Sequence, residues 1–187
     1  ARFAVAPREV ACLQARLAID NAQDNALTRL YALDYAGLFE VTNPGLAALD
    51  WPMLLGGTSN HFRVADLRAI GGWDAWNVTE DADLGLRLAR SRLRVETLRS
   101  TTWEEAPVGL AAWEAQRRRW LKGWMQTAFV HSRAPRALLR EIGPDRALAL
   151  VATLGGGLLN ALLAPLFALR VGFDMARGAF LRVETDL

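Results

Sequence analysis

The sequence predicts an α/β domain followed by membrane-associated helices. In the first part of the chain, segments with the alternating pattern of a strand are interleaved with segments of helical spacing, which favours a sheet covered by helices. Hydrophobic residues make up 52% of the 187 residues, and most of the excess over a soluble domain lies after Ala147. A chain of this length has room for roughly one domain. We expect that domain at residues 1–134 and a membrane-associated region at residues 135–187.

The first predicted elements are a strand and a helix. Residues 10–17, VACLQARL, alternate apolar residues with polar ones such as Gln14, as in a strand that is buried on one face. Asp24 or Asn25 can then cap a helix that runs to about Glu40. The sequence TNPG that follows is expected to end this helix.

The middle of the chain predicts two further strands. Residues 53–64, MLLGGTSNHFRV, indicate a strand interrupted where glycines let the backbone approach another group closely. Asp66 is expected to cap a short turn that ends at Gly71 and Gly72. The second strand is expected at residues 93–98.

A helix is predicted to begin at Thr79, which is a good N-cap residue. Glu80 and Asp81 then take the first two helical positions, where the helix dipole favours anions, and Leu84 and Leu88 fall on one face. This helix start explains the acids without any function. It does not explain the large or charged side chains just upstream, which we expect to form the wall of a cleft: Trp73, Asp74 and Trp76.

The letters Asp81-Ala82-Asp83 make a weak metal motif. Residues two apart on a helix point about 200° apart, so the two carboxylates cannot easily share one ion. No His or Cys lies nearby in the sequence to complete a transition-metal shell, and the ligand spacing of an EF-hand is absent.

A long helix is predicted from about residue 109 to residue 131, and it carries the sequence QRRRW. Gln116, Arg119 and Trp120 are spaced i, i+3 and i+4, so they project from one side. An amide, a guanidinium and an indole on one face suit a sugar-phosphate ligand. The alternative, which is compatible with the first, is a basic helix at the membrane surface whose interfacial anchors are Trp113, Trp120 and Trp124.

The sequence GGTSNHFR, residues 56–63, is a third candidate for binding. Its glycines permit close approach of the backbone, and Ser59, Asn60 and His61 supply hydrogen-bonding groups. The motif is not specific by itself, because an isolated His is more often a structural hydrogen-bonding group than a catalyst.

Residues 147–169 carry no charge and predict a transmembrane helix. Their length matches a hydrocarbon core of roughly 30 Å, and membrane helices tolerate the Pro165 and glycines that this segment contains. The alternative is a buried hairpin in a larger core. The Arg- and Lys-rich residues before the span would lie on the cytoplasmic side. Interleaved tryptophans make a membrane a better partner for them than a nucleic acid.

The lone Cys12 excludes an intrachain disulfide and suits a reducing compartment.

The order of these motifs resembles that of the family 2 glycosyltransferases. TED at residues 79–81 is followed, 35 residues after Asp81, by the QxxRW sequence that starts at Gln116, with an apolar span behind it. The strings GGTSNHFR, GGWD, TEDADLGLRL and EEAP (residues 104–107) lie where such enzymes carry similar strings, so the resemblance covers nearly the whole chain. The most similar branch comprises the membrane-bound cellulose-synthase-like and hyaluronan-synthase-like enzymes.

The resemblance implies a GT-A fold, which is a mixed, mainly parallel sheet flanked by helices that binds a nucleoside-diphosphate sugar. Asp81 would be the general base of an inverting transfer to a saccharide, and Arg119 would contact the donor diphosphate. Trp120 would stack on the acceptor sugar, and Gln116 would shape the junction between donor and acceptor. A helix-start position would keep Asp81 ionised but moderate its strength as a base. Further substrate contacts are expected from Glu80, Ser59, Asn60 and His61, whereas Asp83 is expected to be a solvated or supporting acid.

The resemblance also implies Mg²⁺ or Mn²⁺, held by an earlier D-x-D. No counterpart precedes Val10, so we expect the metal ligands, and the donor-binding half, upstream of Ala1, with no metal ligand in this fragment, which would be inactive alone. The expected product is a growing polysaccharide, made by a multi-pass protein of the inner (cytoplasmic) membrane with its catalytic domain in the cytoplasm. Two alternatives remain open: a transferase that acts on a membrane lipid, and a non-catalytic membrane scaffold of the same fold.

Overall fold

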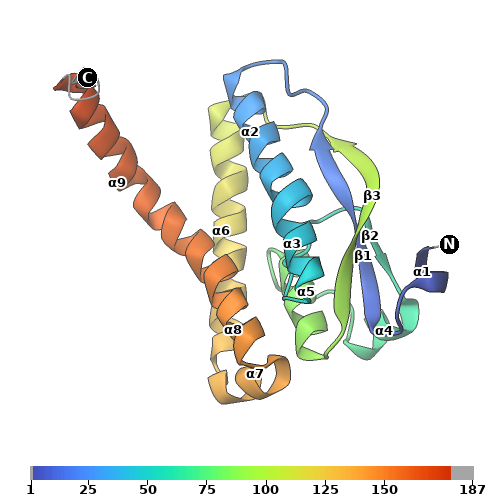
Figure 1. Ribbon diagram of the computed structural model, residues 1–187. Coiled ribbons are helices and arrows are strands. Elements are labelled where there is room, and N and C mark those ends of the chain that lie inside the picture. The colour runs from blue at the N-terminus through green and yellow to red at the C-terminus, as the bar shows by residue number, and fades with distance from the viewer. Residues whose placement is uncertain (1, 178–187) are drawn as a thin grey trace, which may run out of the picture.

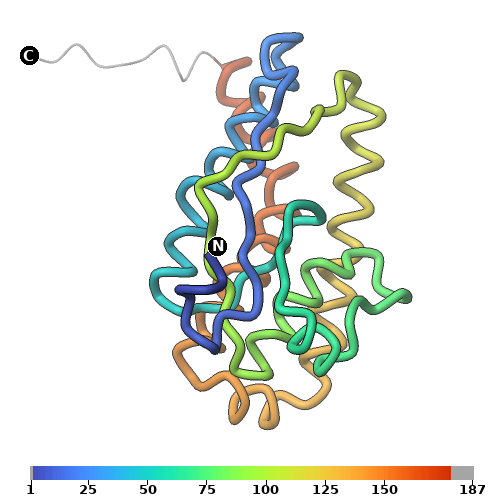
Figure 2. The backbone as a smooth tube through the Cα atoms, turned by 90° about the vertical axis from the view of Figure 1, so that its right-hand side faces the viewer, coloured from blue at the N-terminus to red at the C-terminus, as the bar shows by residue number. Residues whose placement is uncertain are grey.

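A computed structural model describes residues 2–177 of the chain and has the predicted α/β class. Its sheet contains β1 (Val10–Ile19), β2 (Asn60–Phe62) and β3 (Arg94–Glu104) in the order β2-β1-β3. β1 pairs antiparallel with β2 and parallel with β3, and Figure 2 shows β1 and β3 running side by side. The sheet is therefore mixed. A short helix, α1 (Arg2–Val5), precedes it.

Residues 10–15 of β1 are buried on both faces, so the prediction of a strand buried on one face was wrong for this part, whereas from Arg16 on the burial alternates as predicted. Gln14 has only 1% of its surface exposed. Its side-chain amide donates a hydrogen bond to the carbonyl oxygen of Thr58 (2.9 Å) and accepts one from the amide of Gly56 (2.9 Å). A polar side chain can lie in the core here because β1 is the central strand and the neighbouring loop satisfies its hydrogen bonds.

One helical rod follows β1, and the expected break at TNPG is absent. The rod consists of α2 (Ala26–Ala36), the π-helical turn η1 (Gly37–Thr42) and α3 (Asn43–Ala48). Asn25 caps α2 as predicted, with a hydrogen bond from the amide of Thr28. Pro44 lacks an amide hydrogen, and the wider turn before it, in which the amide of Asn43 bonds to the carbonyl oxygen of Leu38, accommodates its ring within a continuous helix.

Only the last part of the strand predicted at residues 53–64 pairs with the sheet, as β2. The preceding residues form an irregular segment, and Gly56 allows the predicted close approach. A Cβ atom at this position would lie 3.0 Å from the ring of Phe39. This segment brings the GGT sequence against η1, in the middle of the rod.

Asp66 lies in the first turn of α4 (Val64–Ala69) but does not cap it, contrary to the prediction. Its carboxylate accepts hydrogen bonds from both terminal nitrogens of Arg8, at 2.7 and 2.9 Å. The predicted end at Gly71 and Gly72 is confirmed, because both have positive φ angles, of 86° and 68°.

α5 (Glu80–Arg90) and α6 (Leu110–Ser132) confirm two predicted helices. Leu84 and Leu88 share the buried face of α5, and both are completely buried. A Cβ atom at Gly85 would overlap the carbonyl oxygen of Met53, so α5 packs directly on the backbone that leads to GGT. In Figure 1, α6 stands beside α2.

The chain continues through α7 (Pro135–Ile142) into one long helix made of α8 (Pro144–Leu150), η2 (Val151–Gly155) and α9 (Gly156–Ala176). This helix spans 33 residues, Pro144–Ala176, and its most apolar window has a mean hydropathy of 1.9. Only 17% of that window is buried, and α9 leans away from the domain in Figure 1. The alternative of a buried hairpin is therefore wrong. By length and composition alone, the helix is able to cross a membrane.

Candidate functional site

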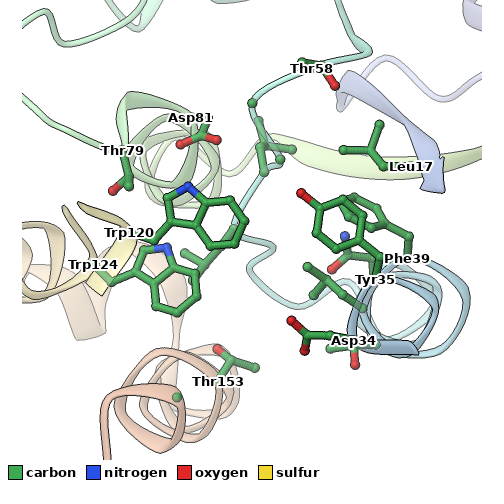
Figure 3. A pocket seen from close by; sticks show the side chains of 18 of the residues that line it. Leu17, Asp34, Tyr35, Phe39, Thr58, Thr79, Asp81, Trp120, Trp124 and Thr153 are labelled. Carbon is green, nitrogen blue, oxygen red and sulfur yellow. The ribbon is translucent and has the colours of Figure 1, made fainter. Parts of the chain in front are cut away.

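A cavity of about 910 Å³ lies between the N-terminus of α5, the middle of α6, the α2–η1 part of the rod and the η2–α9 helix. Five of the predicted site residues line it: Glu80, Asp81, Gln116, Arg119 and Trp120. Figure 3 shows the Asp81 carboxylate on the same side of this cavity as the ring of Trp120. Folding thus brings the TED and QxxRW sequences together.

Asp81 is partly buried at the second position of α5. Its Oδ1 atom accepts a hydrogen bond of 2.7 Å from the amide of Ala82. Burial raises the pKa of Asp81, and the amide hydrogen bond and the charge of Arg119 offset this increase only in part. The expected moderating effect of the helix start is outweighed by desolvation, so Asp81 is a stronger base than an ordinary carboxylate.

The GGT segment closes over Asp81. A Cβ atom at Gly57 would lie 3.2 Å from Asp81 Oδ2, and Gly57 and Thr58 both line the cavity. The glycine therefore leaves the carboxylate open toward the cavity where a side chain would crowd it.

The start of α5 rests on α6 through a close contact of Thr79 with Gly123. Thr79 holds the N-cap position, as predicted, but its hydroxyl makes no capping bond and is buried without a hydrogen-bond partner among the described residues. A Cβ atom at Gly123 would overlap Oγ1 and Cγ2 of Thr79. The side chain of Asn77 accepts a hydrogen bond from the amide of Thr79 (3.0 Å) and donates one to Thr127 Oγ1 (2.9 Å). These contacts join the element that carries Asp81 to the one that carries Trp120.

Gln116 is held by Tyr31 of α2, and Tyr35, one turn further along α2, lies beside Tyr31 and Glu104. The hydroxyl of Tyr31 donates a hydrogen bond of 2.8 Å to Gln116 Oε1. The hydroxyl of Tyr35 lies 3.4 Å from Glu104 Oε2, and Thr58 donates a hydrogen bond of 2.5 Å to Glu104 Oε1. Burial raises the pKa of both tyrosines, so their hydroxyls keep their protons.

These three supporting residues were missed as site residues. Tyr31 and Tyr35 fall within the helix predicted to run to about Glu40, but no role was predicted for either. Glu104 belongs to the EEAP string, whose position in the resemblance was the available signal.

Arg119 differs from the two arginines before it. Arg117 pairs with Asp34 at 2.5 Å and lies over three aromatic rings at 5.0 to 5.6 Å from their centroids, whereas Arg118 pairs with Glu114 at 2.6 Å. Arg119 is exposed at the cavity and, within residues 2–177, has no carboxylate in ion-pair contact. Its guanidinium is therefore available to an anionic ligand.

Aromatic and apolar groups form the rest of the cavity wall. The rings of Trp120 and Trp124 are stacked, with centroids 6.5 Å apart and an angle of 28°. In Figure 3 this pair separates Asp81 from Thr153 of η2. The wall formed by the rod and the long helix is largely apolar and includes Leu38, Val41, Leu154 and Gly157.

The other predicted contacts lie outside the cavity lining. Ser59 Oγ is 2.6 Å from Thr102 Oγ1, and Asn60 donates a hydrogen bond of 2.5 Å to the carbonyl oxygen of Gly56. His61 is exposed, and its backbone pairs with Leu13. These three residues shape the segment that presents Thr58.

The turn that contains Trp73, Asp74 and Trp76 does not form a wall of this cavity, contrary to the prediction. Trp73 packs edge-on against Phe62, with ring centroids 5.5 Å apart, and Trp76 is 88% exposed. Large side chains alone did not indicate which way the turn faces.

Asp83 is neither solvated nor in the cavity. It is 4% exposed and accepts hydrogen bonds from Arg87 Nε (2.7 Å) and the His131 ring (2.8 Å). Burial would raise the pKa of Asp83, but these hydrogen bonds outweigh it and lower the pKa. A histidine thus lies beside the D-x-D after all. Within residues 2–177, however, no three His, Cys, Asp or Glu side chains are grouped to hold a metal ion.

Comparison with known families gives one match over nearly the whole chain. The family model described as "Glycosyl transferase family group 2" matches residues 1–175. The matched region includes every residue that lines the cavity.

Proposed function

Because the chain belongs to family group 2 of the glycosyl transferases, we propose that it is an inverting glycosyltransferase that moves a sugar from a nucleoside-diphosphate sugar to a growing polysaccharide. The observation that carries this proposal is the placement of Asp81 in one cavity with Gln116, Arg119 and Trp120. The family membership supports sugar transfer in general, and the geometry supports the roles given to these residues.

Asp81 acts as the general base. It removes the proton of an acceptor hydroxyl while that oxygen forms a bond to the anomeric carbon of the donor sugar. The bond from this carbon to the diphosphate oxygen breaks with its electron pair, so the configuration inverts and the nucleoside diphosphate leaves. The raised pKa of Asp81 suits this role, because a base with a pKa nearer to the working pH accepts the proton more readily.

The remaining cavity residues bind and orient the donor and the acceptor. Arg119 contacts the donor diphosphate, for which a guanidinium without a competing carboxylate is well suited. The face of Trp120 stacks on the acceptor sugar, and Gln116, fixed by Tyr31, shapes the junction between the two substrates. Glu80, which lines the cavity beside Asp81, hydrogen-bonds to sugar hydroxyls.

A divalent ion would neutralise the leaving diphosphate in such a reaction. The described residues do not fit such a site, because no three metal-ligating side chains among them are grouped. We therefore assign no metal ligand among residues 2–177.

A second candidate acceptor is a lipid-linked sugar. Leu38 and Val41 of the rod form an apolar wall together with Leu154, which belongs to the helix that is long and apolar enough to cross a membrane. A lipid chain on that wall would leave its polar head near Asp81. Product analysis by mass spectrometry separates the two acceptors, because a glycolipid extracts into organic solvent with one or a few sugars, whereas a polysaccharide gives a ladder of chain lengths.

The test is sugar transfer by membranes that contain the Asp81→Asn variant, supplied with radiolabelled UDP-glucose, UDP-N-acetylglucosamine and GDP-mannose in turn. Loss of a general base lowers turnover by about 10²- to 10⁴-fold. Asp74→Asn is the matched control, because Asp74 lies on an exposed turn outside the cavity lining. Near-normal transfer by Asp81→Asn at normal expression would remove Asp81 as the base. Binding of the donors without transfer by the wild type would instead favour a non-catalytic scaffold.

A further inference from the structure

A line of buried contacts, here named the α5–α6 seam, joins the two helices that carry the candidate site. Its members on α6 are the three buried residues of that helix, spaced four apart: Gly123, Thr127 and His131. They meet, on or just before α5, Thr79, Asn77 and Asp83, respectively. Residues four apart on a helix share one face, so the seam is a single stripe along α6.

His131 makes the most specific contact of the seam. One ring nitrogen, Nδ1, lies 2.9 Å from Arg90 Nη1, and the other, Nε2, lies 2.8 Å from Asp83 Oδ1. A guanidinium can only donate, so Nδ1 accepts the hydrogen bond of Arg90 and Nε2 carries the proton that is donated to Asp83. Both nitrogens are occupied, and His131 and Asp83 are only 5% and 4% exposed. His131 therefore does not contact a ligand of the cavity.

The surrounding charges hold this arrangement from three sides. Arg87 donates to the second oxygen of Asp83 (2.7 Å) and also to the carbonyl oxygens of Ile70 (2.8 Å) and Gly72 (2.6 Å). Arg90 pairs with Glu141 of α7 at 2.5 Å. The buried Asp83 carboxylate favours this one geometry, because a shift of α5 would remove its hydrogen bonds and leave the charge unpaired.

The position of the seam relative to the cavity gives it a consequence for chemistry. Asp81 is two residues before Asp83 on α5, and Trp120 is one turn before Gly123 on α6. A rotation or slide of α5 against α6 would change the position of the Asp81 carboxylate relative to Arg119 and Trp120. Within residues 2–177 no hydrogen bond or ion pair joins these three side chains, so their relative position depends on how α5 packs against α6, and the seam contains the buried polar contacts of that packing.

We propose that His131 is a positioning residue for Asp81, acting through Asp83 to fix the register of α5 against α6. This inference rests on the proposed function, in which Asp81 is the base that removes a proton from the acceptor. A neutral histidine suits this position because its ring accepts a hydrogen bond from Arg90 and donates one to Asp83 at the same time.

The experiment compares His131→Leu with His131→Gln in membranes that contain the full protein. Leu fills space but can neither donate nor accept. The side-chain amide of Gln can do both, with its oxygen toward Arg90 and its nitrogen toward Asp83. Displacement of a catalytic group by about 1 Å costs about 10²-fold. We therefore expect His131→Leu to lower kcat by about 10- to 100-fold with the KM for the UDP-sugar little changed, and His131→Gln to recover most of the rate.

Asp66→Asn is the control for a loss of stability alone. It weakens a carboxylate–arginine pair with Arg8 that lies outside the cavity lining. We expect a lower Tm with an unchanged kcat. Wild-type kcat in His131→Leu, or no recovery in His131→Gln, would overturn the proposal.

A second measurement needs no activity. The chain has two histidines, His61 and His131, so ¹⁵N NMR of labelled imidazoles in detergent, assigned with His61→Asn, reads the protonated nitrogen of His131 directly. We expect the proton on Nε2, and faster amide hydrogen exchange at residues 80–84 in His131→Leu. A proton on Nδ1, or unchanged exchange, refutes the positioning pair even if His131→Leu accumulates poorly. A wild type with the expected tautomer but no sugar transfer refutes the proposed function instead.

Discussion

Asp81 and Asp83 lie two residues apart on α5, and the pKa of the first is raised whereas that of the second is lowered. Side chains two positions apart on a helix point about 200° apart, so one carboxylate faces the cavity and the other faces α6. Burial dominates at Asp81, while hydrogen bonds from His131 and Arg87 dominate at Asp83. The opposite pKa shifts give the two carboxylates different properties: Asp81 accepts a proton more readily, whereas Asp83 stays ionised.

The two aspartates should have opposite effects on stability. The folded protein binds a proton at Asp81 more tightly than the unfolded chain does, so ionised Asp81 destabilises the fold as the pH rises through its raised pKa. Asp81→Asn should therefore raise the Tm at pH 7. Asp83 stabilises the fold above its unfolded pKa and loses this effect as the pH falls through its lowered pKa. Asp83→Asn should cost about 1–3 kcal/mol at pH 7. Thermal unfolding in detergent checks both, and a lower Tm in both variants would contradict the assignment of Asp81.

The acid side of the pH–rate profile should report Asp81. The base must be ionised, so kcat/KM should fall with decreasing pH at a value above that of an ordinary aspartate. The charge of Arg119 lowers the pKa of Asp81, so Arg119→Gln should move this fall to higher pH, besides weakening donor binding. Arg118→Gln, at an exposed arginine paired with Glu114, should leave the profile in place. An identical pH–rate profile for the wild type, Arg119→Gln and Arg118→Gln would exclude Asp81 as the group whose ionisation the profile reports.

Gly123 should not tolerate a side chain. An alanine Cβ atom would overlap Thr79, and crowding of a packed contact costs about 1–3 kcal/mol. Gly123→Ala should lower the Tm and reduce kcat, and Thr79→Ala in the same protein should restore part of both. Gly45→Ala is the control, because nothing lies within 4 Å of a Cβ atom at this helical position, so stability should stay equal or rise. Equal Tm values for Gly123→Ala and Gly45→Ala would show that the contact of Gly123 with Thr79 accommodates a methyl group without cost.

The expected cytoplasmic orientation of the domain can be tested with a single introduced cysteine. The native Cys12 is completely buried, and burial raises the pKa of its thiol to about 12, so it should not react with maleimides. We expect Glu105→Cys, at an exposed position of the domain, to be labelled in intact cells by a membrane-permeant maleimide and not by an impermeant one, because the Arg-rich residues before the long helix favour the cytoplasmic side. Labelling by the impermeant reagent would place the domain on the outer face.

The sequence predicted those features that depend on neighbours along the chain. The structure contains the predicted features that are local. They are the helix starts at Asn25 and Thr79, the placement of Gln116 and Trp120 on one side of a helix, and the glycine stop at Gly71. The burial of Gln14 was missed because it depends on strands and loops far away in the sequence. Asp83 pairs with its local neighbour Arg87, but its second partner, His131, is 48 residues distant, and no local pattern could indicate that contact.

The break expected at TNPG failed for a different reason. Proline excludes a regular α-helical hydrogen bond, but a π-turn placed before it removes the conflict, and the sequence contains no clear signal for such a turn. The cavity itself was predicted only in part. Asp81 and Trp120 were expected together, whereas Tyr31 and Glu104 reached the site through folding.

The π-turn η1 also keeps one face of the rod in phase. Tyr31, Tyr35, Phe39 and Asn43 are each four residues apart, and all are buried. In a regular α-helix each such step over-rotates by about 40°, so Asn43 would drift about 120° from Tyr31. The extra residue of the wide turn takes up part of that drift. Deletion of one residue from 37–42 would make the helix regular but would destabilise the fold. Every later residue of the rod, including the buried Leu46, would rotate by about 100° away from the core. Chain length in this turn is therefore under stricter constraint than residue identity.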